Sequence, residues 1–179
     1  EKIKKSIATI PKLKEQIDDT AILFKRRVEE RLIRDPRIIH VLDNPNLDEL
    51  DPSSYLGINI RRYVHIPETQ SQAQNFICFQ VDVNESRSLK NDKMKTVVIT
   101  FVVFCEEKTL DTEYDIARHD LLGYFIKDDF NWTNMFGCQG KIVYDKESLT
   151  DKHYSVRTIK FELPGFNGIV KTIDGKPMI

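Results

Sequence analysis

The chain has 179 residues, which is enough for one domain with a substantial core but leaves little room for two. Its 27 Lys and Arg residues nearly balance 28 Asp and Glu residues, so the formal net charge is −1. That balance disfavours a protein that grips nucleic acid through a basic surface. Neither an apolar run of about 20 residues nor a signal peptide is recognisable, so we expect no membrane association.

Residue types that usually carry cofactor or metal chemistry are scattered. The three cysteines, Cys78, Cys105 and Cys138, form no CxxC pair and no zinc pattern with the four histidines. Free thiols in a reducing compartment are the simplest expectation for them. The seven glycines form none of the glycine-rich motifs that cradle phosphates. The sequence therefore predicts no cofactor and no metal ion.

The first part of the chain predicts helix and then an irregular segment. Residues 12–34 place apolar side chains at steps of three and four, which predicts a long amphipathic helix. Residues 35–56 contain three prolines and no glycine, which indicates a loop with short helical turns that crosses the body of the protein. The first 34 residues carry ten basic and six acidic side chains, whereas residues 35–56 carry one basic and five acidic.

Three segments then predict strands, at residues 57–66, 75–83 and 95–107. The third is apolar on both faces, so we expect a helix to cover one face and a helix or another subunit to cover the other. The polar connection at residues 84–94 is longer than a hairpin normally needs, and such extra length is often functional.

The remaining elements complete an α+β pattern. Asp111 or Thr112 can cap a second helix that runs to about Lys127, followed by an aromatic-rich loop over residues 128–140. Two further strands are predicted at residues 141–145 and 154–163, with Pro164 ending the last. We therefore predict an α+β fold, with a mostly antiparallel sheet of about five strands packed against two helices. Residues 1–56 form an N-terminal helix and crossing segment, and residues 57–179 the α+β body, within one domain overall.

Charged residues concentrate in the stretch DIARHDLLGYFI at residues 115–126. Asp115 and His119 are four residues apart, so on a helix they would share a face, and a carboxylate that orients an imidazole is part of a hydrolytic triad. No GxSxG nucleophile turn accompanies them. The apolar positions of this helix point the charges toward water, where local ion pairs are the ordinary outcome. A catalytic dyad, or a metal site shared with Cys105, stays as an alternative.

The connection at residues 84–95 carries a second concentration of charge. Arg87, Lys90, Lys93 and Lys95 outnumber the two acidic residues there. This segment is either a solvated loop or an arm that contacts a neighbouring subunit.

In this order of elements the chain resembles the tail-terminator and neck (head-tail joining) proteins of tailed bacteriophages. The segments that carry the resemblance are YVHIPETQSQAQNFICFQVDV, KTVVITFVVFCEE, DTEYDIARHDLLGYFIKDDFNW and MFGCQGKIVYDKESLTDKHYSVRTIKFEL. Together they span about residues 57–163. The resemblance lies in the order and character of these segments, with no invariant motif.

The resemblance implies a virion protein that is not an enzyme. Such proteins form a ring, commonly of six subunits, at the head-proximal end of the tail tube. The ring ends tube polymerisation and joins the tail to the head connector, and genome DNA passes through its lumen without sequence-specific contact. Assembly would take place in the host cytoplasm, with the tail-tube protein and the connector proteins as partners. The candidate subunit-interface residues are Arg87, Lys90, Lys93, Lys95, Asp115, Arg118 and His119.

Three other functions stay open. One is a connector-side neck protein, either an adaptor or a stopper. The second is a small hydrolase that uses Asp115 and His119. The third is a monomeric binding module.

Overall fold

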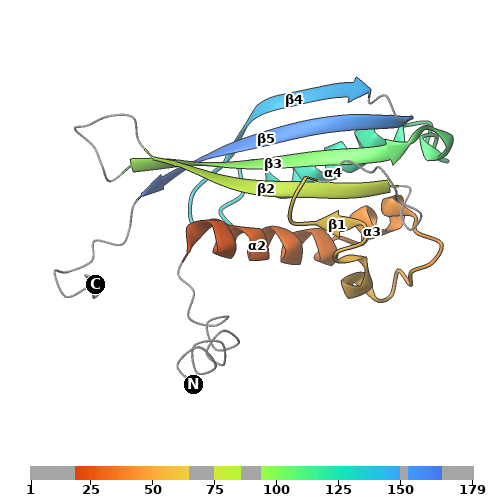
Figure 1. Cartoon of the computed structure of the whole chain (residues 1–179), viewed down its shortest axis with the longest axis horizontal. Helices are drawn as coiled ribbons and strands as arrows, with labels where there is room; N and C mark the ends of the chain where they lie inside the picture. The colour runs from red at the N-terminus through yellow and green to blue at the C-terminus, as the bar shows by residue number, and fades with distance from the viewer. Residues whose placement is uncertain (1–18, 65–74, 86–93, 150–152, 167–179) are drawn as a thin grey trace, which may run out of the picture.

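The computed structural model describes residues 19–64, 75–85, 94–149 and 153–166, and shows helices layered against one sheet (Figure 1). The helices are α2 (Thr20–Arg34), α3 (Pro36–Leu42), η1 (Pro52–Tyr55), η2 (Glu107–Thr109) and α4 (Arg118–Phe130). The strands are β1 (Ile60–Arg61), β2 (Asn75–Glu85), β3 (Met94–Glu106), β4 (Lys141–Leu149) and β5 (Tyr154–Phe166). None of the described helices is long and apolar enough to cross a membrane.

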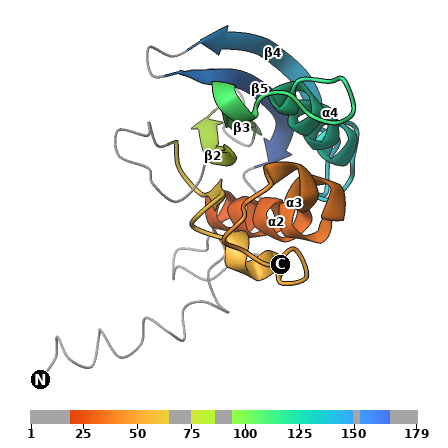
Figure 2. The same ribbon diagram turned by 90° about the vertical axis from the view of Figure 1, so that its right-hand side faces the viewer.

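The five strands form a single sheet in the order β1-β2-β3-β5-β4. Only β1 and β2 are parallel, and the other neighbours are antiparallel. This confirms the predicted α+β fold with a mostly antiparallel sheet, although three α-helices pack on it instead of two. The first strand is also much shorter than the prediction at 57–66, since within the described residues 57–64 it comprises only Ile60–Arg61. Figure 2 shows the three α-helices on one side of the sheet.

Aspartates at two junctions set where the first helices begin. The Asp19 carboxylate accepts a hydrogen bond from the backbone N–H of Ile22 at 3.0 Å, which caps α2. Asp35 ends α2 and caps α3 by accepting from the N–H of Arg37 at 2.9 Å, while Pro36 occupies the first turn. The long N-terminal helix is confirmed from Thr20 onward, and the earlier part of the prediction lies outside the described residues.

Phenylalanines form the centre of the core between the sheet and the helices. Phe101 on β3 is aligned with Phe79 on β2 and with Ile159 on β5. Its ring lies 4.9 Å from the ring of Phe130 at the end of α4 and 5.7 Å from that of Phe161. All of these side chains are buried. Alternate residues of the strands therefore meet α4 and α2 in one apolar layer.

The opposite face of the sheet carries a smaller apolar cluster. It comprises Phe76, Cys78, Val102, Phe104 and Val156. The rings of Phe76 and Phe104 are stacked at 4.7 Å, and the guanidinium of Arg61 lies over Phe76 at 5.4 Å. This confirms that β3 is apolar on both faces. Because Phe76 and Cys78 are fully buried in the single chain, this part of the face is covered without another subunit.

The last two strands run longer than their sequence patterns indicated. β4 continues to Leu149, with a bulge between Ile142 and Tyr144. The prediction that Pro164 ends β5 is wrong, because Pro164 is aligned with Thr96 and the strand continues to Phe166. β4 joins β5 only as far as Glu162, so Pro164 lies in an edge segment, where a missing N–H is tolerated.

Candidate functional site

The start of α4 gathers the chemically active side chains of the described chain. The helix begins at Arg118, and Ala117 at its N-cap position supplies no capping side chain. The prediction that Asp111 or Thr112 caps it is therefore wrong. Thr112 instead closes a turn by donating to the carbonyl oxygen of Ile116 at 2.7 Å. Asp115 lies in this turn with φ of 55°, a left-handed conformation that aspartate tolerates better than most residues.

The prediction that the charges of this segment face water is wrong for Arg118 and His119. Arg118 is 8% exposed and His119 is 2% exposed. The guanidinium of Arg118 donates to the carbonyl oxygens of Val41 at 2.5 Å and Thr109 at 2.6 Å, and to the Asp43 carboxylate at 3.1 Å. Arg118 thus ties the end of α3 to the segment between β3 and α4.

His119 points into the sheet from the same turn. Its Nε2 lies 2.9 Å from Glu147 Oε1 on β4, and its Nδ1 lies 3.5 Å from Ser155 Oγ on β5. The predicted sharing of one helical face by Asp115 and His119 is wrong, because Asp115 precedes the helix. Glu147 takes the place of the carboxylate partner that the sequence had suggested.

A second set of charges surrounds Arg157 on β5. Its guanidinium pairs with Asp120 on α4, and also donates to Asp145 on β4 at 2.8 and 3.0 Å. Lys127 adds a further bond to Asp145 at 2.9 Å. Hydrogen bonds from Arg157 hold the pKa of Asp145 below its usual value, aided by the Lys127 bond and opposed by burial. The pairs join α4 to the two outer strands.

Gly123 permits this close approach of α4 to β5. A Cβ atom at that position would lie 2.7 Å from Cδ of Arg157 and 3.0 Å from its Nε. Both distances are shorter than ordinary van der Waals contact, so a larger residue would displace the Arg157 side chain. Glycine in the middle of a helix is otherwise unfavourable by about 1 kcal/mol relative to alanine. The need for space beside Arg157 is therefore the reason for a glycine at this position.

The arrangement has the parts of two kinds of chemical site. Ser155, His119 and Glu147 follow one another as the residue types of a hydrolytic triad do, but the serine faces Nδ1 and the carboxylate faces Nε2, the reverse of the usual arrangement. However, Ser155 is 1% exposed, so its hydroxyl is not open to a substrate. His119, Asp120 and Glu147 also offer ligand atoms within 4.8 Å of one another, as a cation site would. Arg157 already pairs with Asp120 there and would oppose a bound cation.

Cys105 belongs to the core rather than to this set. It is fully buried on the helix-facing side of β3. Burial raises the pKa of its thiol to about 12, so the thiol stays protonated at neutral pH. The alternative of a metal site shared by Asp115, His119 and Cys105 therefore lacks a ready thiolate.

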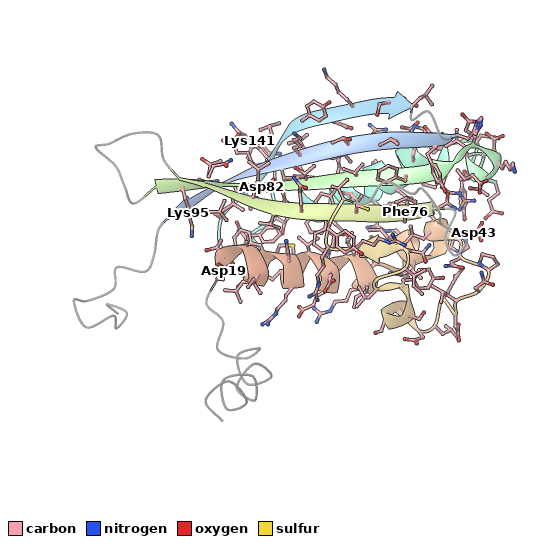
Figure 3. All side chains as sticks on the ribbon, viewed as in Figure 1. Asp19, Asp43, Phe76, Asp82, Lys95 and Lys141 are labelled. Atoms are coloured by element: carbon pink, nitrogen blue, oxygen red, sulfur yellow. The ribbon has the colours of Figure 1, made fainter. Side chains whose placement is uncertain are left out.

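A pocket of about 300 Å³ opens beside the Arg118 guanidinium. Its walls come from the end of α3, including His40 and Asp43, and from the turn that contains Asp111 and Glu113. Figure 3 shows Asp43 at one end of the molecule, far from Asp19 and Lys95 at the other. The pocket thus marks one end of the fold.

The predicted interface residues are dispersed in the structure. Arg87, Lys90 and Lys93 lie outside the described residues. Lys95 begins the described side chains of β3, and its Nζ donates to Thr20 Oγ1 of α2 at 2.7 Å. Asp115 is exposed, whereas Arg118 and His119 are committed to bonds within the fold.

The sequence did not indicate the partners of the charged residues at the start of α4. Asp43, Glu147 and Arg157 are remote from that helix in the chain. One signal was available for Arg157. On β5, every second residue faces the helices, and Arg157 lies between Ser155 and Ile159 on that inward stripe. A cation on an apolar stripe indicates a buried ion pair.

Comparison with known families adds an independent observation. The YomW family model matches residues 35–163. The chain belongs to the YomW family. The matched residues run from the cap of α3 to three residues before the end of β5, so the match includes the whole α4 charge cluster. No curated protein matches the chain.

The YomW family is phage-derived, of the kind found in Bacillus prophages. This YomW protein is therefore phage-related, which confirms the coarser part of the resemblance. A tail-terminator role goes beyond the family match.

Proposed function

We propose that this protein is a structural component of a phage tail neck, a tail terminator that assembles as a ring at the head-proximal end of the tail tube. The observation that carries the proposal is the match to a phage-derived family over residues 35–163. That span contains all of residues 57–163, whose order of elements resembles terminator and neck proteins. The two lines of evidence therefore concern the same part of the chain.

The charge cluster at α4 supports a structural role over catalysis. Glu147 engages His119, Arg157 engages Asp120, and three oxygen acceptors engage Arg118. The Ser155 hydroxyl, next to His119, is buried. These bonds fix the helix against the outer strands, as a subunit that keeps its shape in an assembly requires. A hydrolase would instead need a nucleophile open to its substrate.

The proposed ring uses two kinds of predicted interface residue. Asp115 offers charge at the surface directly, Lys95 is half-buried beside Thr20, and Arg87, Lys90 and Lys93 add charge in the connection before β3. Arg118 and His119 are buried and contribute indirectly, because their hydrogen bonds fix the start of α4 and with it the preceding turn, where Asp115 is exposed. A ring of identical subunits needs contacts between two different surfaces of each copy.

The test is assembly of the full chain. Purified protein is examined by mass photometry and negative-stain electron microscopy, and then added to polymerising tail-tube protein of the same phage. We expect closed rings and tubes that stop growing when the protein is present. A strict monomer at high concentration would overturn the proposal. Binding to the connector without any effect on tube length would overturn the terminator role.

A matched variant separates assembly from catalysis. His119→Gln keeps a hydrogen-bond donor near Glu147 but cannot act as an imidazole base. We expect rings and tube termination to persist in this variant, below its melting temperature. Hydrolytic activity in the wild type that disappears in the variant would overturn the structural proposal.

A further inference from the structure

One end of the molecule is strongly acidic although the whole chain is almost neutral. Residues 43–51 and 107–115 together hold eight exposed carboxylates and only one basic residue, Lys108. The carboxylates are those of Asp43, Asp48, Glu49, Asp51, Glu107, Asp111, Glu113 and Asp115. We call this surface the acidic end, and Figure 2 looks onto it.

The two segments of the acidic end meet around the pocket. Asp43 from the first segment and Asp111 and Glu113 from the second line its walls. His40, another lining residue, lies 3.2 Å from the Glu49 carboxylate and so ties the first segment to the pocket. The positive charge of Arg118 is already met by Asp43 and two carbonyl oxygens, and the histidines that pair with Glu49 and Glu107, His40 and His153, are themselves exposed.

The acidic end, together with Ile116 directly after it, also exposes apolar side chains. Leu50 is 91% exposed, Tyr114 is 51% exposed and Ile116 is 47% exposed. Large apolar side chains among charged ones, beside a pocket, are typical of surfaces that another protein covers.

A surface of opposite charge lies along α2. Arg27, Arg31 and Arg34 are spaced by four and three residues, so they share one face of the helix, and all three are exposed. Arg27 donates to the Met135 carbonyl oxygen and Arg31 to Asp129, each through one of five donor N–H groups. We call these three arginines the basic face. Figure 1 shows α2 along a flank of the molecule, so the basic face and the acidic end are different surfaces.

We propose that the acidic end of one copy docks on the basic face of α2 in a second copy. Arginine forks match carboxylates bidentately, and Tyr114, half exposed, supplies an aromatic ring with which a guanidinium can form a cation–π contact. Because the two surfaces differ, the contact is head-to-tail and repeats from copy to copy until a ring closes. The inference rests on the proposed ring and names the surfaces that build it.

A charge-swap experiment tests the contact. One variant carries Asp111→Lys and Glu113→Lys, a second carries Arg27→Glu and Arg34→Glu, and a third carries all four substitutions. Arg31 is left unchanged because it neutralises the buried Asp129. Assembly is followed by mass photometry over a range of protein and salt concentrations, and melting temperatures confirm that each variant is folded. Asp82→Lys and Lys141→Glu, two exposed positions on other surfaces, serve as matched controls.

We expect each two-residue variant to raise the protein concentration needed for assembly at least tenfold. The four-residue variant should assemble at a concentration close to that of the wild type. High salt should weaken wild-type assembly. Wild-type rings that neither two-residue variant weakens would overturn the docking contact and leave the proposed function standing. Weakening by both variants without rescue in the four-residue variant would also overturn the direct pairing. A wild type that never assembles would overturn ring and contact together.

Discussion

The guanidinium of Arg118 at the start of α4 donates to the carbonyl oxygen of Val41 near the end of α3, 2.5 Å away and 77 residues earlier in the chain. The same side chain reaches Thr109 and Asp43, so one residue holds three segments together. This contact supports the walls of the pocket and the acidic end.

Replacing Arg118 should therefore be costly. Arg118→Ala leaves the carbonyl oxygens of Val41 and Thr109 without their donor, and we expect a loss of about 3 kcal/mol in unfolding free energy. Urea denaturation followed by circular dichroism measures the change. Arg118→Lys keeps the charge but not the planar fork, so it should recover only part of the loss. A loss below about 0.5 kcal/mol in the alanine variant would contradict the bracing role.

Gly123→Ala tests the close approach of α4 and β5. Alanine favours helix over glycine by about 1 kcal/mol, but its Cβ would displace Arg157 from Asp120 and Asp145. We expect a net loss of stability in the wild-type background. In a chain that already carries Arg157→Ala the steric conflict is gone, so Gly123→Ala should become stabilising. Equal effects in both backgrounds, in a double-mutant cycle, would show that Arg157 is not the obstacle.

The Asp145 carboxylate should make stability depend on acid pH. Its pKa is lowered in the folded protein by Arg157, so the folded state binds the proton less readily than the unfolded state does. The stabilisation is present above the ordinary aspartate pKa of about 4 and is lost as pH falls through the lower folded value. Asp145→Asn should be less stable than wild type at pH 7. The difference should narrow below about pH 4. A difference in unfolding free energy between the two proteins that stays constant from pH 7 to pH 3 would contradict the stabilising role of the Asp145 carboxylate.

Phe101 should be a major contributor to the core. Its ring packs on Phe130 and Phe161 and is fully buried. We expect Phe101→Ala to lower the unfolding free energy by about 3–5 kcal/mol, because the cavity cannot close between the sheet and α4. Phe101→Leu should cost less, since it retains most of the volume. Similar losses for the two variants, measured by denaturant titration, would argue against cavity formation as the cause.

Residue patterns in the chain determined the order of helices and strands, the α+β class and the two-sided apolar character of β3. These features follow from local periodicity and from caps and prolines, which act over a few residues. Asp35, for instance, both ends α2 and caps α3 through bonds within two residues of itself.

Only the tertiary structure decided where the DIARHDLLGYFI charges lie. Arg118 is three and four residues before Leu121 and Leu122 and so shares their helical face, whereas His119 was expected on the side toward water with Asp115. In the fold, α4 lies between α3 and the outer strands, so Val41 and Asp43 meet Arg118 on one side, and Glu147 meets His119 on the other. Those partners come from elements 28 to 77 residues away. Burial of a charge depends on partners that distant, and local periodicity carries no record of them.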